Sequence, residues 1–293
     1  MITSVIISTY TEERYNDVLK CIRLLREQTH KPDEIILVLD PVDELIDFYS
    51  GVVPECVKIV ASDGFGLSNA RNSGVKIAKG DVIAFIDDDA WPDHRWLENM
   101  IKNYRDKKVW GVGGKIVPVF DECRPRWLPE ELDWVVGCTY KGMPERRSEV
   151  RNPIGANMSF RKEAFEVAGL FRTEVGRYGK KLLSGEEAEF AMRLKKLIPS
   201  AKIVYDPEVV VYHRVPRNRA RLKYVLKRSY YEGYSKALLA REYPLKGEYN
   251  YLRYLIFKSI PDKVRRASFL ELTGLLVVVL MVVVGNIVGR TIR

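Results

Sequence analysis

Short apolar runs rich in β-branched residues alternate with helix-like segments through the N-terminal part of the chain. The runs are residues 5–8, 34–39, 57–60 and 82–87. The segment after the first run repeats apolar residues at helical spacing, with Val18, Ile22 and Leu25 on one face. Strands that are apolar throughout and alternate with helices are typical of parallel sheets covered on both faces. We therefore predict an α/β, Rossmann-like fold with a mostly parallel sheet and helices on both faces.

Composition narrows the class of protein further. The chain has 293 residues, of which 46% are hydrophobic and 30% are charged. A chain of this length and composition can bury a large core, which excludes a disordered or collagen-like protein. Its four cysteines, at positions 21, 56, 123 and 138, show no C-x-x-C spacing. We therefore expect reduced thiols, and neither a zinc ribbon nor a disulfide framework.

Polar residues directly follow several of the predicted strands. They are Ser8, Thr9 and Tyr10 after the first strand, Asp40 after the second, and Asp87, Asp88 and Asp89 after the fourth. In sheets of this type ligands bind beyond the carboxyl ends of the strands, so these side chains are candidates for a binding site. The chain has no G-x-G-x-x-G after its first strand and no G-x-x-x-x-G-K-[ST]. A dinucleotide-binding domain and a P-loop enzyme are therefore disfavoured.

The three consecutive aspartates carry the strongest chemical signal. Adjacent carboxylates repel one another, which is costly unless a cation neutralises them, and strand alternation places Asp87 and Asp89 on one side with Asp88 on the other. Carboxylate oxygens are ligands for Mg²⁺ or Mn²⁺, which also bind substrate phosphates. The alternative is a solvated turn before a helix. His213, which ends the strand-like run 209–212, could complete a metal site or be a hydrogen-bonded structural residue.

The segment 185–194 contains three glutamates at helical spacing. Glu187 shares a helix face with apolar residues, and a carboxylate in the first turn of such a face is a candidate general base. Glu186 and Glu189 are expected to face solvent, where they compensate the helix dipole and Glu189 pairs with Arg193 four residues later.

The net charge of +9 is distributed unevenly along the chain. Residues 1–213 contain 31 Lys and Arg against 34 Asp and Glu, whereas residues 214–293 contain 17 against 5. Within this basic part, residues 269–288 form an apolar run that is long enough to cross a bilayer as a helix. Because the larger basic cluster precedes the run, we predict a single-pass membrane protein whose main domain is cytoplasmic. A buried core helix is the alternative.

The segment before this apolar run is basic and rich in tyrosine. In residues 217–243, lysines and arginines surround apolar residues that recur at helical spacing, together with Tyr224, Tyr230, Tyr231 and Tyr234. Such a helix is typical of an anionic membrane surface, where basic residues meet headgroups and tyrosines occupy the interface. The alternative is a helix docked on the protein with a solvated basic face. Nucleic acid is a poorer partner, because the predicted transmembrane helix follows closely.

The order and spacing of several motifs resemble those of family 2 glycosyltransferases, which have the GT-A fold. The motifs are STY (8–10), ASDGFGLSNARNSGVKIAKGDVIAFIDDD (61–89), GANMSF (155–160), GEEAEFAMRL (185–194) and VYH (211–213). This resemblance covers about residues 3–213. The forms TYTEERYNDVLKCIRLLREQT, RWLPEEL and RNPIGAN, with the C-terminal apolar run, further resemble archaeal glycosyltransferases of the glucuronosyltransferase type, which extend dolichol-phosphate-linked sugars.

The resemblance implies roles for individual residues. The nucleotide contacts that it implies are Ser8, Thr9, Tyr10, Asp40, Asp63, Arg71 and Asp87. It implies a metal site at Asp89 and His213, with Asp87 nearer the ribose, and a general base at Glu187, where the family usually has aspartate. The residues implied beside the sugar and the acceptor are Gly155, Ala156 and Asn157. We also expect residues 120–150 to form an acceptor-side insert, because aromatic residues such as Trp127 alternate there with arginines.

The expected activity is transfer of a sugar, with inversion, from a nucleotide-sugar such as UDP-glucuronate to a dolichyl-phosphate-linked sugar in N-glycan assembly. The expected cofactor is Mg²⁺ or Mn²⁺. One alternative is transfer directly to dolichyl or polyprenyl phosphate, for example from GDP-mannose, and another is a membrane-anchored binding protein without catalysis. The expected domains are a catalytic domain at 1–213, interface helices at 214–267 and a transmembrane helix at 268–289. No motif indicates the oligomeric state.

Overall fold

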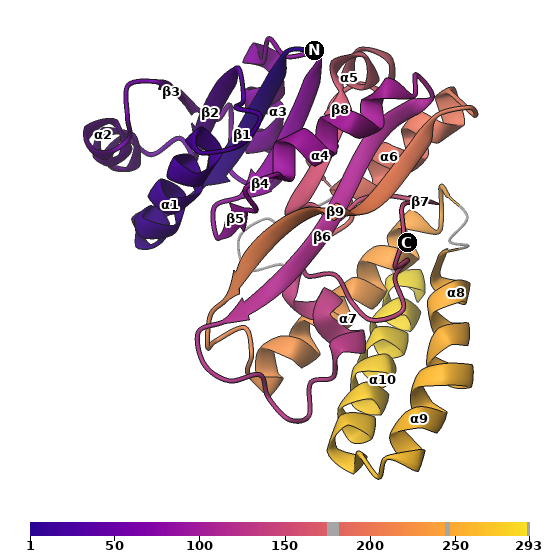
Figure 1. Cartoon of the computed structure of the whole chain (residues 1–293). Helices are drawn as coiled ribbons and strands as arrows, with labels where there is room; N and C mark the ends of the chain where they lie inside the picture. Colours follow the sequence, from indigo (N-terminus) through magenta and orange to yellow (C-terminus); the bar gives the residue numbers. More distant parts are fainter. Residues whose placement is uncertain (175–181, 244–246, 292–293) are drawn as a thin grey trace. The chain divides into compact units, whose positions relative to one another are not determined.

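The computed structural model describes residues 1–174, 182–243 and 247–291 (Figure 1). The chain divides into two compact units. The first comprises Met1–Val117, Glu145–Gly179 and Glu186–His213, and the second comprises Pro118–Pro144, Lys180–Gly185 and Arg214–Arg293.

A nine-stranded mixed sheet lies at the centre of the first unit. In spatial order its strands are β3 (Val57–Ala61), β2 (Glu34–Leu39), β1 (Thr3–Thr9), β4 (Val82–Asp87), β8 (Asn157–Arg161), β6 (Val109–Phe120), β9 (Lys202–Val215) and β5 (Ala90–Pro92), with β7 (Ser148–Val150) paired to β9. The strands β1 to β4 are parallel, as the alternation of strands and helices predicts. From β8 onward, antiparallel strands extend the parallel part of the sheet. The alternation of strands and helices in the sequence did not predict these antiparallel strands.

Helices cover both faces of this sheet, as predicted (Figure 1). They are α1 (Tyr15–Arg26), α2 (Asp43–Val52), α3 (Leu67–Ile77), α4 (Trp96–Lys102), α5 (Lys162–Ala168) and α6 (Glu186–Leu197), with short turns η1 (Glu12–Arg14) and η2 (Asn103–Arg105). The predicted apolar face of α1 is buried. On α3, a Cβ at Gly74 would lie 2.8 Å from the Ile6 side chain, so glycine permits α3 to approach β1 closely. Together with α5 and α6, α3 encloses an apolar core on one face of the sheet.

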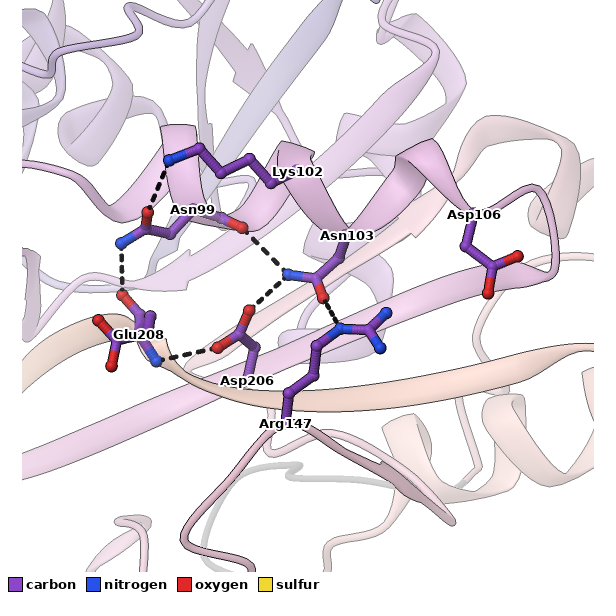
Figure 2. A pocket seen from close by; sticks show the side chains of 7 residues that line it. All are labelled: Asn99, Lys102, Asn103, Asp106, Arg147, Asp206 and Glu208. Atoms are coloured by element: carbon purple, nitrogen blue, oxygen red, sulfur yellow. Dashed lines mark hydrogen bonds between the residues drawn. The ribbon is translucent and has the colours of Figure 1, made fainter.

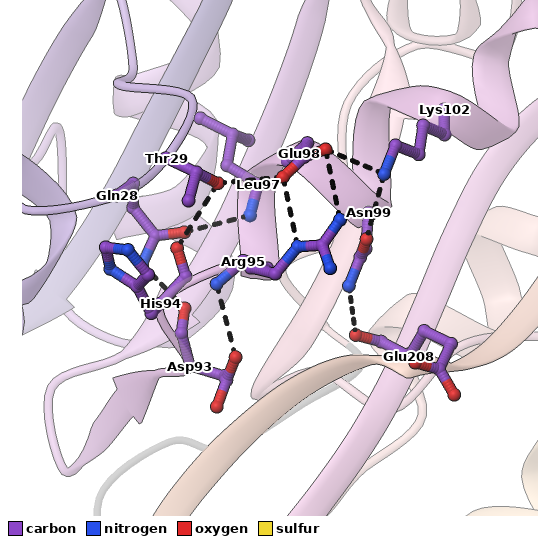
Figure 3. Close-up of polar contacts among 10 residues, drawn as sticks. All are labelled: Gln28, Thr29, Asp93, His94, Arg95, Leu97, Glu98, Asn99, Lys102 and Glu208. Atoms are coloured by element: carbon purple, nitrogen blue, oxygen red, sulfur yellow. Dashed lines mark hydrogen bonds and ion pairs between the residues drawn. The ribbon is translucent and has the colours of Figure 1, made fainter.

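A polar network fixes the chain that follows the three aspartates (Figure 3). Gln28, beyond the end of α1, donates through Nε2 to Asp93 O at 2.6 Å, and its Oε1 accepts from the Leu97 N–H at 3.0 Å. Thr29 Oγ1 donates to Glu98 Oε2 at 2.9 Å. These bonds tie the end of α1 to the start of α4. They therefore hold the intervening strand β5, and with it the aspartates that precede β5.

The second unit is helical. Its elements are η3 (Glu130–Val136), α7 (Leu222–Leu239), α8 (Gly247–Tyr254), the π-helical turn η4 (Leu255–Ser259), α9 (Ile260–Arg265) and α10 (Phe269–Thr291). Their shared apolar core includes Leu128, Leu132, Val225, Leu255 and Leu275. By length and composition, α10 is able to cross a membrane. The four cysteines are free, as expected.

Candidate active site

The carboxyl ends of β1, β2 and β4 lie side by side, because these strands are parallel neighbours. Ser8 stands beside Asp87 in the register of β1 and β4, and the Asp40 N–H donates to Thr9 O at 3.2 Å. Thr9 is buried, Ser8 is half-buried and Tyr10 is exposed. The structure therefore brings the polar residues of three strand ends to one edge of the sheet.

Asp87, Asp89 and His213 come together at this edge. Each offers one ligand atom, and the three atoms lie within 4.8 Å of one another. The strand β5 pairs with β9 so that Ala90 stands opposite His213, and His213 Nε2 lies 3.1 Å from Asp89 Oδ1. Asp89 and His213 are buried, whereas the Asp87 side chain is 29% exposed. Residues from two distant segments thus form a compact group of metal-ligand type.

The charges around this group fit a divalent cation. The charged groups are the carboxylates of Asp87, Asp88, Asp89 and Glu186 and the guanidinium groups of Arg14 and Arg71. Four negative charges thus face two positive ones, which leaves an excess of about two negative charges when His213 is neutral. The two carboxylates are donors that suit both Mg²⁺ and Mn²⁺, and the neutral imidazole adds a common metal ligand. The residues present therefore fit the predicted metal.

Arg14 is a member of this cluster that the sequence did not indicate. It lies at the N-terminal end of α1 and pairs with Asp88 and, at 3.2 Å, with Asp89 Oδ2. Burial raises the pKa of Asp88 to about 6; Arg14 opposes this rise and Asp89 adds to it. A single arginine before a predicted helix resembles any surface arginine in the sequence. Only the fold identifies it as a partner of the aspartates.

Arg71 connects four segments around Asp87. Its buried guanidinium donates from Nη2 to Asp87 Oδ1 and to Gly155 O, both at 3.1 Å, and from Nη1 to Glu186 Oε1 at 2.9 Å. A Cβ at Gly155 would lie 2.9 Å from Arg71 Nη2, so this loop approaches the arginine closely. Arg71, a predicted nucleotide contact, therefore lies beside the candidate metal ligands.

The expectation that Glu186 and Glu189 face solvent is wrong. They are 4% and 0% exposed, whereas Glu187, expected on the apolar face, is partly exposed. Glu186 pairs with Arg71, and Glu189 pairs with Arg193 at 2.9 Å, as its spacing predicts. Because α6 is buried on most of its circumference, apolar spacing does not show which carboxylates face the interior. Arginine partners determine this, and the partner of Glu186 comes from another element.

Glu187 lies in the first turn of α6, one residue after Glu186. The ion pair between Glu186 and Arg71 fixes this end of the helix, and Arg71 also contacts Asp87. The candidate base is therefore adjacent in sequence to a residue of the charged cluster, with a side chain that solvent reaches.

Asp40 and Asp63 lie in different surroundings. Asp40 is half-buried, which raises its pKa, and it accepts a hydrogen bond from the backbone of Gly66. Gly66 has a φ of 99°, which favours glycine, and it begins α3. Asp63 is exposed and pairs with Lys76 at 2.6 Å, which lowers the pKa of Asp63. The glycine-rich turn thus reaches Asp40, whereas Asp63 lies on the surface.

Asn157, expected beside the sugar, is fully buried in the sheet. Its Nδ2 donates to Lys115 O at 3.0 Å and to Val209 O at 2.8 Å, and its Oδ1 accepts from Trp96 Nε1 at 2.8 Å. The neighbouring Ala156 is also buried. The Asn157 amide is therefore occupied in joining β6, β9 and α4, which is a structural role.

We expect Asn157→Ala to lower the free energy of unfolding by about 3 kcal/mol, because each buried polar group left without a partner costs roughly 1–3 kcal/mol. Urea denaturation measures the loss. Asn16→Ala, at an exposed position of α1, is the matched control and should be nearly neutral. Equal stability of the two variants would show that the buried amide contributes nothing to folding.

Trp127, expected on the acceptor side, belongs to the second unit. It is partly buried and packs against the apolar core that contains Leu128 and Leu275. Its carbonyl lies so close to Gly274 that a Cβ there would come within 1.9 Å of the oxygen. Trp127 therefore packs beside α10, and its contact with an acceptor stays a prediction.

A polar hollow of about 350 Å³ lies beside α4 and β9 (Figure 2). Its lining residues are Asn99, Lys102, Asn103, Asp106, Arg147, Asp206 and Glu208. Several are bonded to one another, since Arg147 Nε donates to Asn103 Oδ1 at 2.6 Å and Asn103 Nδ2 donates to Asp206 Oδ2 at 2.8 Å. The hollow contains no member of the metal-ligand group and is not the candidate active site.

The mixed sheet and the aspartate–histidine group at its edge agree with the GT-A type of glycosyltransferase that the sequence motifs resemble. The sequence model described as Glycosyl transferase family 2 matches residues 4–169, and the chain belongs to this family.

Named relatives and solved structures agree with this assignment. The chain is 31% identical over 271 residues to the glucosyl-dolichyl phosphate glucuronosyltransferase of Haloferax volcanii, covering 90% of this chain and 86% of the relative. It is 27% identical to the succinoglycan biosynthesis protein ExoM of Rhizobium meliloti, covering 60% of this chain and 53% of that protein. The fold resembles that of the mannosyltransferase PcManGT from Pyrobaculum calidifontis, which was solved with GDP-Man and Mn²⁺. The TM-score is 0.59 at 18% sequence identity, and the match covers 94% of this chain and 73% of that structure. It also resembles the structure of GalNAc-T7 with UDP, GalNAc and Mn²⁺. The TM-score is 0.58 at 18% sequence identity, and the match covers 86% of this chain and 54% of that structure.

Proposed function

We propose that this glycosyltransferase moves a sugar from a nucleotide-sugar to a dolichyl-phosphate-linked sugar, with inversion and with a divalent metal. The observation that carries the proposal is the convergence of Asp87, Asp89 and His213 beside Arg71. The similarity to the Haloferax relative supports a glucosyl-dolichyl phosphate acceptor and a glucuronosyl donor such as UDP-glucuronate.

The nucleotide is proposed to bind at the strand-end edge. The residues assigned to this role are Ser8, Thr9, Tyr10, Asp40, Asp63, Arg71 and Asp87. Partial burial of Ser8 and Asp40 beside an exposed Tyr10 supports binding of a base and ribose at this edge, and Asp63 lies on the surface, where solvent and ligands reach it. Arg71 supplies a positive charge where the donor's phosphates would approach the acidic cluster.

Asp89 and His213, with Asp87 beside them, are proposed to hold the metal. The imidazole argues against Mg²⁺, which takes oxygen ligands, and both fold neighbours were solved with Mn²⁺. A bound divalent ion stabilises the negative charge that develops on a departing diphosphate.

Glu187 is proposed to accept the proton of the acceptor hydroxyl. That oxygen then forms a bond to the anomeric carbon while the bond from this carbon to the diphosphate oxygen breaks, so the configuration inverts. The partly exposed position of Glu187 supports access by an acceptor. Gly155 and Ala156 are proposed to border the sugar, since the Gly155 carbonyl bonds to Arg71. A phosphate acceptor is already ionised and needs no base, so Glu187 favours a sugar hydroxyl.

A second candidate function is transfer of mannose from GDP-mannose directly to dolichyl phosphate. The observation that favours it is the fold of the mannosyltransferase PcManGT with GDP-Man bound, which covers most of this chain. In both cases a lipid-linked acceptor supports action at a membrane surface. We propose that the enzyme acts at the cytoplasmic face of the cell membrane and is attached there through the apolar helix α10.

Transfer assays distinguish the two functions. We expect purified full-length protein with Mn²⁺ to move labelled glucuronate from UDP-glucuronate to glucosyl-dolichyl phosphate, giving a lipid product one sugar larger. GDP-mannose and bare dolichyl phosphate are the matched alternative substrates. Mannose on bare dolichyl phosphate would favour the second candidate. Absence of any labelled lipid with either pair would contradict both.

A further inference from the structure

The helix α10 is covered by protein on one side and exposed on the other. Its buried residues are Gly274, Leu275, Val278, Gly285 and Gly289. Its exposed large apolar residues are Phe269, Leu270, Leu276, Leu280, Val283, Val284 and Ile287. Each set recurs at steps close to helical periodicity, so each forms a stripe along the helix. The exposed apolar stripe therefore runs parallel to the helix axis for nearly the full length of α10.

Glycines pack the covered side of α10 tightly on α7. A Cβ at Gly285 would lie 1.9 Å from Tyr230 O, and a Cβ at Gly233 would lie 1.9 Å from Val282 O. The two backbones are therefore in direct contact, as at small-residue helix interfaces. Asn286 Nδ2 adds a hydrogen bond to Gly233 O at 3.2 Å.

The helix α7, unlike α10, is charged along its length. Lys223 and Lys227 are exposed, and Glu232 pairs with Arg228 at 2.9 Å and with Lys236 at 3.4 Å. Charged side chains within hydrocarbon are strongly unfavourable. If α10 crossed a bilayer, α7 would either enter the hydrocarbon with these charges or separate from α10 and lose the glycine contacts. The packing thus conflicts with a crossing that keeps this helix pair intact.

Basic residues border the exposed apolar stripe. Arg265 and Arg266 precede α10, Arg290 lies near its end, and all three are exposed. The consecutive helical elements α8, η4 and α9 run antiparallel to α10 (Figure 1). Their residue Phe257 is 75% exposed and is followed by the exposed Lys258. Large apolar residues edged by lysine and arginine are typical of helices that lie in the interface of an anionic membrane.

We propose that α10 lies in the plane of the membrane, with its exposed apolar stripe toward the acyl chains and both of its ends on the same side of the bilayer. The arrangement keeps α7 packed on α10 and keeps the charges of α7 in water or among headgroups. The partner that covers the exposed apolar stripe is a bilayer that contains anionic lipid. The inference goes beyond the proposed function and does not depend on which sugar is transferred.

The test is the accessibility of the two ends of α10 in sealed inverted membrane vesicles from cells that express the full chain. The background is Cys56→Ser with Cys123→Ser, since these two cysteines are exposed and Cys21 and Cys138 are buried. Single cysteines are then added at two exposed positions, Ala267→Cys before α10 and Thr291→Cys at its end. A variant that keeps Cys56 reports the side on which the first unit lies. The probe is a membrane-impermeant maleimide, applied with and without detergent.

We expect both added cysteines to react as fully as Cys56 without detergent, in protein that sediments with the membranes. Protection of Thr291→Cys until detergent is added would show a crossing and would overturn the proposal. Recovery of the protein in the soluble fraction, as a monomer or as a dimer joined through the stripe, would overturn it as well. Because labelling does not require catalysis, a failed transfer assay would leave this result unaffected.

A second variant tests the lipid contact itself. Leu280→Lys places a charge in the exposed stripe, and the matched control Leu197→Lys makes the same change at the exposed end of α6 in the first unit. Sedimentation with vesicles of phosphatidylcholine and phosphatidylglycerol should fall about tenfold for Leu280→Lys, because a charge opposes burial of the stripe among acyl chains, and should be unchanged for Leu197→Lys. Unchanged sedimentation of Leu280→Lys would contradict contact between the stripe and lipid.

Discussion

Glu187→Gln is expected to lower the rate of sugar transfer by about 10²–10⁴-fold, the range that general-base catalysis contributes. The amide keeps the size of the side chain but cannot accept the proton of the acceptor hydroxyl. Binding of the donor should survive, because the proposed nucleotide contacts lie on other elements. Transfer from UDP-glucuronate under saturating donor measures the first effect, and a thermal shift with the same nucleotide measures the second.

The matched control for Glu187→Gln is Glu166→Gln, which makes the same chemical change at an exposed position of α5. The control should transfer sugar at the wild-type rate. If Glu187→Gln also did so, Glu187 would not be the base, and the result would favour an acceptor that is already ionised, such as a phosphate. A loss of donor binding along with transfer would instead indicate a disturbed site.

Asp89→Asn is expected to weaken Mn²⁺ binding and to lower transfer by roughly 10²–10³-fold, the cost of losing a group that stabilises charge in the transition state. His213→Ala should act in the same direction but less strongly, because it removes a neutral ligand rather than a charged one. Calorimetric titration with Mn²⁺ measures binding, and chelation of the metal should abolish transfer by the wild-type protein. Asp47→Asn, at an exposed position of α2, is the matched control.

The stability of Asp89→Asn separates a functional role from a structural one. In metal-free protein Asp89 stands among other carboxylates that outnumber the two arginines paired with them. Removing a negative charge relieves their repulsion, so we expect the metal-free variant to unfold at the same temperature as the wild type or higher. Wild-type protein should gain more stability from added Mn²⁺ than the variant. A metal-free variant that melts well below the wild type would assign Asp89 to the folding of this edge.

Signals that are local in sequence predicted the main elements. Apolar strands separated by helices indicated the parallel part of the sheet, and the acidic residues at the end of β4 indicated a cation site. The apolar run that became α10 was equally clear. These features depend on neighbouring residues, so no knowledge of distant contacts was needed to find them.

Contacts between distant segments decided the rest. No local pattern predicted that Arg14 contacts Asp88, that Glu186 is buried against Arg71, or that the amide of Asn157 is bonded within the sheet. The sequence determined which side chains could bind a metal or carry a proton, because chemical type and the position after a strand are local properties. Only the tertiary structure decided which charges are paired and which helix covers another, because burial makes an ion pair or a glycine contact depend on residues that the chain brings together from far apart.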